Sequence, residues 1–440
     1  MTTAESAEAQ TRLLFHRQFQ LYWLTRVLST AGYQIMQVAI MWQVLQLTGS
    51  AWQLGLVGGV MWIPVIIGTF LIGYVADHYD RRMIILVCQI SKALGAAMLL
   101  IAGFTGNLSV GLIWLVVLFI SAGRAFEGPT LHTIPPSVMP QEVLSRAIAA
   151  GNTAHQVAQI GGPAVGGILL AAGGTDVVYY VCFAMFLIAG ICISLVEIKR
   201  PAKVKKAVTL ESVFAGFTYI TSRPIIFGAV TLDLAAVLLG GVTAILPLVA
   251  QDVLKAGPEA FGLLRSSPAM GAIIMGFFLA HVQINKHAGR IMIGAVIIYG
   301  LATAVFGFIG VLISSGQAPA WGFTVISHLP AWAANISVWL GLCMFLLAIT
   351  GAADAVSVVV RHSLVQTRTP NEMLGRVMAV NSTFTGTTSN LGQLETGIVA
   401  TLLGVGPAIV VGGLGAAAMA ILWIKLFPDF WRVQSVIPEK

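Results

Sequence analysis

Charged residues are scarce in this sequence. Of its 440 residues, only 9% are Asp, Glu, Lys or Arg, whereas 57% are hydrophobic. Because soluble globular proteins carry about 25% charged residues, this composition excludes a water-soluble globule and predicts an integral membrane protein. The formal net charge of +7 would suggest a nucleic-acid ligand in a soluble chain. Here the basic residues lie between hydrophobic runs, as the positive-inside rule requires, and no nucleic-acid partner is expected.

Cysteines and catalytic motifs are also scarce. The four cysteines all fall within hydrophobic runs and have no metal-ligand spacing, so we expect packing residues and neither a disulfide framework nor a metal site. No glycine-rich nucleotide loop with its lysine is present, which argues against ATP as the energy source. Paired metal-ligand histidines and a recognisable serine-histidine-acid arrangement are missing too. We therefore predict a protein that is not an enzyme and has no cofactor.

Long apolar runs are abundant. A membrane-spanning helix needs roughly 20 apolar residues, and the sequence contains twelve such segments. The predicted spans are 19–46, 52–76, 83–104, 110–133, 143–172, 177–196, 225–250, 260–282, 291–313, 332–360, 373–403 and 407–427. The predicted fold class is an all-α membrane protein with twelve transmembrane helices.

Basic residues are distributed unevenly between the loops. If the N-terminus is cytoplasmic, the inner loops hold most of them, including Arg81, Arg82 and Arg361, whereas the outer loops hold only Lys255. This asymmetry predicts a multi-pass protein of the inner membrane with both termini in the cytoplasm. The polar first seventeen residues contain no apolar stretch, so we expect no cleavable signal peptide. We expect the protein to act as a monomer in the lipid bilayer.

A basic stretch divides the chain into two halves that resemble each other. The predicted parts are a cytoplasmic tail (1–18), a six-helix bundle (19–196), a cytoplasmic linker (197–222), a second six-helix bundle (223–427) and a second cytoplasmic tail (428–440). A shift of 230 positions aligns Pro140 and Arg146 with Pro370 and Arg376. Parallel repeats of this kind predict two pseudo-symmetric bundles, with the substrate site at their interface.

Several ionisable residues lie inside the predicted spans, where they are costly and usually functional. They are Arg26, Lys92, Arg124, Glu127, Asp233, Asp354 and Glu395. The repeat offsets relate Arg124 to Asp354 and Arg26 to Asp233, so we predict attraction between the halves. Our hypothesis is that Arg124 and Asp354 help to close the cytoplasmic side. The alternative is that each charge pairs within its own half.

Arg124 and Glu127 lie three residues apart, on one face of a helix, and are followed by Gly128. This pattern resembles a motif on helix four of proton-coupled drug exporters. The resemblance implies that the carboxylate takes up and releases a proton, with Glu127 as the first candidate and Asp233 as the second. The alternative is an ion pair that only holds its helix in place.

Two further motifs suggest moving helices. Gly73, Asp77, Asp80, Arg81 and Arg82 resemble the loop signature of the major facilitator superfamily. The resemblance implies a gating loop, in which we expect Asp77 to face the helix start near residues 371–375.

A helix breaker stands among small residues in the fifth predicted span. Gly162, Pro163, Gly166 and Gly167 let neighbouring helices approach closely and bend. They resemble the glycine-proline motif of antiporters, although general membrane packing explains them nearly as well.

The runs 48–55, 76–85 and 366–376 resemble the subfamily of siderophore exporters that includes the enterobactin exporter, within the major facilitator superfamily. The resemblance implies proton-driven export of a siderophore by alternating access, with Arg26, Lys92 and Arg124 as contacts for an anionic ligand. The alternative is a multidrug or macrolide antiporter, and the least supported reading is a non-transporting enzyme or sensor. The expected substrate cavity contains Gln34, Gln37, Trp42, Trp62, Phe126 and Glu395.

Overall fold

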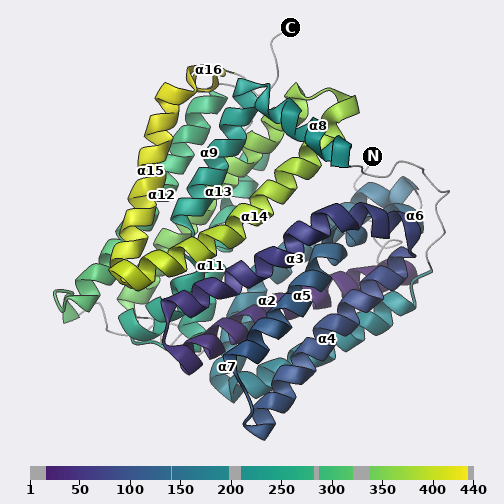
Figure 1. Ribbon diagram of the computed structural model, residues 1–440, viewed down its shortest axis with the longest axis horizontal. Helices are drawn as coiled ribbons and strands as arrows, with labels where there is room; N and C mark the ends of the chain where they lie inside the picture. Colours follow the sequence, from purple (N-terminus) through teal and green to yellow (C-terminus); the bar gives the residue numbers. More distant parts are fainter. Residues whose placement is uncertain (1–15, 140, 198–209, 282–286, 321–336, 435–440) are drawn as a thin grey trace. The chain divides into compact units, whose positions relative to one another are not determined.

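The computed structural model describes residues 16–139, 141–197, 210–281, 287–320 and 337–434. These residues form helices joined by short connections (Figure 1). The chain divides into two compact units, of which the first comprises Met1–Gln43 and Ile63–Val208 and the second comprises Val44–Trp62 and Thr209–Lys440. The division between residues 208 and 209 falls within the predicted linker (197–222), of which residues 198–209 lie outside the description.

The helices of the first half follow the apolar runs. They are α2 (Arg17–Thr48), α3 (Ala51–His78), α4 (Arg81–Thr105), α5 (Val110–His132), the short α6 (Pro135–Val138) and α7 (Gln141–Ser194). Local sequence sets their ends: Asp80 and Ser109 accept hydrogen bonds from backbone N–H groups at the starts of α4 and α5. Gly174 has φ +72° and breaks the helical geometry inside α7, so one element contains two of the predicted spans.

The second half begins with α8 (Leu210–Thr221) and α9 (Pro224–Gly240), followed by the short turns η1 (Thr243–Ile245), α10 (Leu246–Leu248) and η2 (Val249–Val253). The remaining helices are α11 (Pro258–His281), α12 (Ala288–Ser314), α13 (Val338–Arg368), α14 (Asn371–Leu403), α15 (Val405–Leu426) and α16 (Pro428–Trp431). The last part of the predicted linker is thus helical, and it packs on α14 through the stacked rings of Phe217 and Phe384, 6.1 Å apart.

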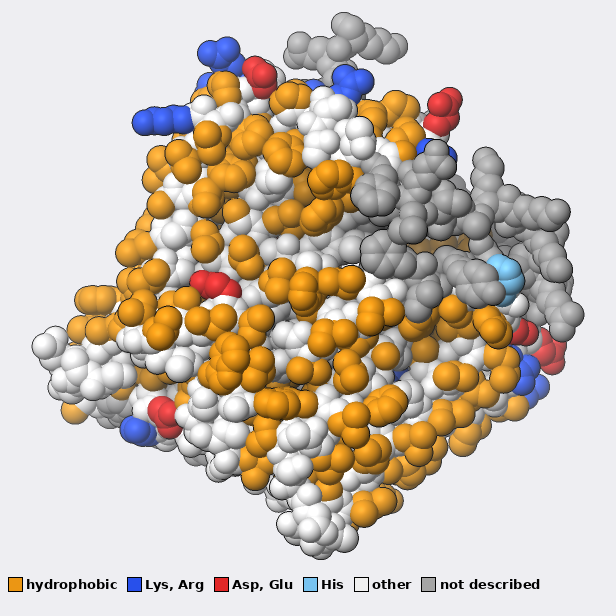
Figure 2. Space-filling view, viewed as in Figure 1, with side chains coloured by type: hydrophobic (Ala, Val, Ile, Leu, Met, Phe, Trp, Pro, Cys, Tyr) orange, Lys and Arg blue, Asp and Glu red, His pale blue; other side chains and the backbone are white. Residues whose placement is uncertain are grey.

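Membrane character is evident in both the helices and their surface. Among the described residues, nine helical segments are long and apolar enough to cross a bilayer, with the kinked α7 counted once. Large apolar side chains such as Phe104, Phe277 and Leu402 are more than two-thirds exposed. On the face shown in Figure 2, hydrophobic side chains cover most of the described surface. The all-helical membrane fold is confirmed, whereas the count of twelve spans stays a prediction.

The first predicted cytoplasmic tail lies almost entirely outside the described residues. The second is described as far as residue 434, and it covers the start of α12. The N–H groups of Ala288 and Gly289 donate to the carbonyl oxygens of Gln434 and Val433, both at 3.3 Å, while Phe430 is fully buried. These bonds supply partners for N–H groups that the first turn of a helix leaves free.

Glycines allow very close helix contacts in the second unit, in which Val44–Trp62 pack with the C-terminal half. A Cβ added at Gly55 would lie 2.8 Å from the Cα of Gly397, where α3 meets α14. Where α11 meets α13, a Cβ at Gly271 would overlap the carbonyl oxygen of Ala348. Close approach of the backbones therefore replaces side-chain interdigitation at these crossings.

We predict that Gly271→Ala destabilises the protein by about 1–3 kcal/mol, because the new methyl group would force α11 and α13 apart. Gly276→Ala on the same helix is the control, since a Cβ there meets nothing within 4 Å. Thermal unfolding of the purified variants in detergent would show a lower midpoint for the first substitution alone. Equal midpoints for Gly271→Ala and the wild type would contradict this packing.

Candidate functional site

A closed ion pair lies in the first unit, formed by Glu127 on α5 and Lys92 on α4. Lys92 Nζ lies 2.8 Å from Glu127 Oε2, and both side chains are fully buried. Glu127 Oε1 accepts hydrogen bonds from Gln89 Nε2 at 2.7 Å and from the hydroxyl of Ser29, to which Lys92 also donates. Each carboxylate oxygen therefore has a donor, and the charge of Glu127 is neutralised within its own unit.

Arg124 is a secondary partner of Glu127. Its NH1 atom lies 3.9 Å from Glu127 Oε2, its side chain is 25% exposed, and its guanidinium stacks over the ring of Tyr33 at 5.0 Å. The Arg124–Glu127 proximity expected from their spacing is present, but Lys92 makes the shorter contact. The sequence predicted Lys92 as a cation inside a span and as a contact for an anionic ligand, but not as the partner of Glu127. The signal available in the sequence was a basic residue, Lys92, in one predicted span and an acidic residue, Glu127, in the next.

Arg26 on α2 is a buried cation with neutral partners. It is 4% exposed, and its guanidinium donates to Tyr22 OH at 2.8 Å and to Asn152 Oδ1 at 3.0 Å. Within the described residues it has no carboxylate partner. His155 of α7 lies close to Asn152 in the sequence, and its Nδ1 atom is 3.1 Å from the hydroxyl of Thr30 on α2. Lys92 is already paired with Glu127. The additional charges of Arg26 and Arg124 therefore give the described interior of this unit a surplus of positive charge.

A second ion pair joins α9 to α13 in the second unit. Asp233 Oδ2 lies 3.2 Å from Arg361 Nε, and Ser357 Oγ donates to Asp233 Oδ1 at 2.8 Å. Arg361 NH1 also donates to Asn381 Oδ1 at 2.6 Å and to Thr385 Oγ1 at 3.1 Å. Asp233 and Arg361 are 2% and 1% exposed.

The assignment of Arg361 to an inner loop was wrong. The apolar run ends at residue 360, but α13 continues to Arg368 and buries the guanidinium of Arg361 against Asp233. A charge that follows an apolar run is assigned by hydropathy to a loop, whereas a buried carboxylate can hold that charge inside the helix bundle.

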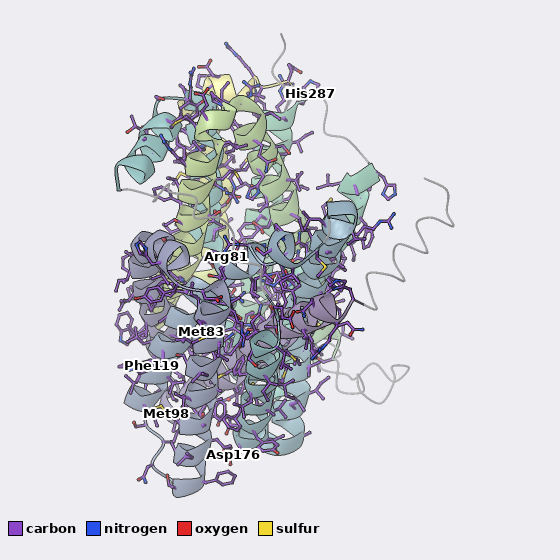
Figure 3. The ribbon with its side chains drawn as sticks, turned by 90° about the vertical axis from the view of Figure 1, so that its right-hand side faces the viewer. Arg81, Met83, Met98, Phe119, Asp176 and His287 are labelled. Atoms are coloured by element: carbon purple, nitrogen blue, oxygen red, sulfur yellow. The ribbon has the colours of Figure 1, made fainter. Side chains whose placement is uncertain are left out.

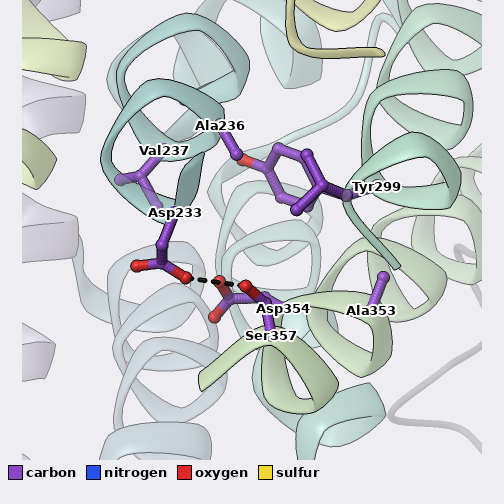
Figure 4. Close-up of a pocket in the computed structure, with 8 residues that line it drawn as sticks. Asp233, Ala236, Val237, Tyr299, Ala353, Asp354 and Ser357 are labelled. Carbon is purple, nitrogen blue, oxygen red and sulfur yellow. Dashed lines mark hydrogen bonds between the residues drawn. The ribbon is translucent and has the colours of Figure 1, made fainter. Parts of the chain in front are cut away.

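A small cavity lies beside this ion pair. It is lined by Asp233, Ala236, Val237, Val296, Tyr299, Ala353, Asp354 and Ser357, which come from α9, α12 and α13 (Figure 4). Ser357 bridges toward Asp233, and Tyr299 OH donates to the carbonyl oxygen of Gly240 at 2.9 Å. The carboxyl of Asp354 forms no hydrogen bond or ion pair with a described residue. The residues that line this cavity therefore include two carboxyl groups and no lysine or arginine.

The predicted attraction between the halves stays a prediction. The partners found for Arg26 and Asp233 belong to the same unit as each of these residues, as in the alternative that the sequence left open. Arg124 likewise contacts Glu127 and Tyr33 of its own unit.

The gating-loop residues hold helix ends together in the first unit. Asp80 Oδ1 accepts a hydrogen bond from the backbone N–H of Arg82 at 2.9 Å. Arg81, labelled in Figure 3, donates at 3.1 Å to the carbonyl oxygen of Thr133 and to Ser137 Oγ, just beyond the end of α5. Gly73 and Asp77 lie within α3, and the side chain of Asp77 lies outside the description. The expected Asp77 contact stays a prediction.

The helix-five motif lies at the contact between α7 and α2. A Cβ added at Gly162 would lie 2.6 Å from Gln34 Cβ, and one at Gly166 would lie 3.1 Å from Ile35 Cα. Pro163 and Gly167 are buried on the same helix, and α7 continues through the proline. The motif thus brings two backbones close together, as the small residues predict.

The residues of the expected cavity are divided between the units. Gln34, Trp42 and Phe126 are half-buried in the first unit, and Gln37 is buried there. Trp62 and Glu395 are half-buried in the second unit, where the hydroxyl of Thr396 lies 3.4 Å from Glu395 Oε2. That all six line one cavity stays a prediction.

Known proteins similar to this chain are membrane transporters. A family model described as transmembrane secretion effector matches residues 11–321. The enterobactin exporter EntS of Shigella boydii serotype 18 (strain CDC 3083-94 / BS512) is 23% identical over 428 residues, which cover 96% of this chain and 95% of the relative. EntS of Escherichia coli O81 (strain ED1a) has the same identity and coverage.

Solved structures extend the similarity of the fold. An auto-inhibited POT family peptide transporter has a TM-score of 0.70 at 11% identity, covering 96% of this chain and 99% of the other. A D-xylose–proton symporter has a TM-score of 0.68 at 13% identity, covering 95% and 99%. A bacterial homologue of the iron transporter ferroportin, in an inward-facing state, has a TM-score of 0.66 at 14% identity, covering 95% and 100%.

We predict that Lys92→Met destabilises the protein by about 3–5 kcal/mol, because it leaves the buried carboxylate of Glu127 without its main counter-charge. The double variant Lys92→Met/Glu127→Gln removes both charges and should recover most of the loss. Chemical denaturation in mixed micelles measures both effects. A single variant as stable as the wild type would show that the pair is not closed in the way described.

Proposed function

We propose that this chain, which belongs to the transmembrane secretion effector family of the major facilitator superfamily, exports an anionic, siderophore-like molecule from the cytoplasm in exchange for protons. That it is a multi-pass membrane transporter follows from its apolar helices and from its similarity to exporters over 96% of its length. The substrate class, the coupling ion and the mechanism of alternating access are the proposed part.

The observation that carries the proposal is the unneutralised positive charge inside the first unit. Lys92 forms an ion pair with Glu127, so we no longer expect Lys92 to contact the ligand, as the sequence had suggested. Arg26 and Arg124 remain, the first bound only to neutral oxygens and the second partly exposed. Guanidinium groups bind carboxylates and similar oxygen anions strongly and with defined geometry. An anionic cargo would supply the missing counter-charge.

Proton coupling is supported by buried carboxyl groups in both units and by the absence of a nucleotide loop from the sequence. One protein of the same fold is by its name a proton symporter. Alternating access is supported by the division of the chain into two compact units. We further propose twelve spans as two six-helix bundles, a monomer, and an inner-membrane location with both termini in the cytoplasm, as the distribution of basic loop residues indicates.

Efflux of amphipathic drugs such as macrolides is the second candidate. The observation in its favour is the set of acidic groups in the second unit, where Asp354 has no partner among the described residues and Glu395 is half-buried. Carboxylates and aromatic rings such as Trp62 would suit a cationic substrate.

We predict that Arg124→Gln lowers secretion of enterobactin about 10–100-fold, because a hydrogen bond between charged groups contributes about 1.5–3 kcal/mol. The assay measures enterobactin in the medium of a strain that lacks its own exporter and expresses either this chain or a variant. Arg290→Gln is the matched control, since Arg290 is exposed and stacks on Trp431.

Drug resistance is measured in parallel in the same strains. Secretion that depends on Arg124 but not on Arg290 supports the proposal. Drug resistance without enterobactin secretion would favour the second candidate, and neither activity from a folded wild-type protein would contradict both.

A further inference from the structure

We infer that Asp354 is the carboxyl group that binds the coupling proton, in the cavity between α9, α12 and α13. This inference rests on the proposed proton coupling and names the site that performs it. It differs from the expectation drawn from the sequence, which placed the proton on Glu127 and, as a second choice, on Asp233.

The arrangement begins with one face of α13. Ser357 and Arg361 follow Asp354 by three and seven residues, so all three lie on the same side of the helix. At 1.5 Å per residue, Arg361 lies about 10 Å along the axis from Asp354. Asp233 on α9 is bound by the other two residues, with Oδ1 on Ser357 and Oδ2 on Arg361. Both oxygens of Asp233 are therefore occupied, and its charge is compensated.

Arg361 is not free to compensate a second carboxylate. Its Nε atom faces Asp233, and its NH1 atom is held by Asn381 and Thr385 of α14. Arg361 is only 1% exposed, and turning toward Asp354 would break these contacts. Arg361 is thus committed to Asp233.

Asp354 is left facing the cavity beside the carboxyl group that is paired with Arg361 (Figure 4). The titratable and charged groups around it are Asp233 from α9, Tyr299 from α12 and Arg361 of α13 itself. Tyr299 donates its hydroxyl proton to the carbonyl oxygen of Gly240. The contact of α11 with α13 runs through Gly271, Pro268 and Gly351, and the charged residue of α11 nearest to this contact in the sequence is the half-buried Arg265, three positions before Pro268. A second unpaired carboxylate in such a place is costly, and a bound proton removes that cost.

Glu127 is in the opposite situation. Its two oxygens accept bonds from Lys92, Gln89 and Ser29, and all of these groups favour the charged carboxylate. Protonation of Glu127 would leave Lys92 as an uncompensated buried cation. The two carboxyl groups therefore have separate tasks: Glu127 is an ionised structural partner, and Asp354 is the group that changes its protonation state.

Infrared difference spectroscopy on the purified full-length protein in liposomes tests this assignment without any substrate. At neutral pH, the C=O stretching band of a protonated carboxyl group should be present in the wild type and lost in Asp354→Asn. Asp354→Glu should keep a band at a shifted position, and Glu127→Gln should leave the wild-type band unchanged. Persistence of the band in Asp354→Asn, or its loss in Glu127→Gln, would overturn the inference.

Transport in proteoliposomes provides the second readout, with enterobactin as the probe. Asp354→Asn should retain exchange of enterobactin at equal pH and lose accumulation driven by a pH gradient. Loss of both in a variant with a wild-type unfolding midpoint would count against a coupling role. A wild-type protein that does not move enterobactin would contradict the proposed substrate, while the infrared band would still decide the protonation of Asp354.

Discussion

An ionised side chain inside an apolar helix bundle must find a counter-charge or become neutral, and this requirement organises the interior of the protein. Two pairs meet it directly: Lys92 with Glu127 in the first unit, and Arg361 with Asp233 in the second. Each pair is supported by hydroxyl or amide groups that occupy the remaining oxygens or nitrogens. These contacts make buried charge tolerable without any partner from outside the unit.

The groups that remain have opposite signs in the two units. Among the described residues of the first unit, Arg26 has only neutral partners and Arg124 shares Glu127 with Lys92, whereas in the second unit Asp354 has no ion-pair partner among the described residues. An anionic cargo and a proton are the two ligands that would neutralise them. The proposed function therefore places cargo binding and ion coupling in different units of the chain.

Much of the fold could be predicted from the sequence, because hydropathy acts over whole segments. Each apolar run overlaps a helix, and the resemblance to siderophore exporters within the major facilitator superfamily is confirmed by the family match and by the relatives. The charged positions inside the spans were also visible. Their pairing was not, because the repeat offset relates equivalent residues of the two halves but says nothing of neighbours within one half. Lys92 and Arg361 became recognisable as partners only when helix packing placed them beside Glu127 and Asp233.

If buried charges of opposite sign couple an anionic cargo to protons, the fluxes of cargo and protons must be linked, and both can be measured at the same time. Proteoliposomes containing the wild-type protein and an internal pH-sensitive dye would be loaded with enterobactin and diluted into enterobactin-free buffer, with the membrane potential clamped. With protons entering in exchange, the lumen should acidify as enterobactin leaves, at a rate that follows its efflux. Enterobactin efflux with an unchanged lumen pH would contradict this coupling.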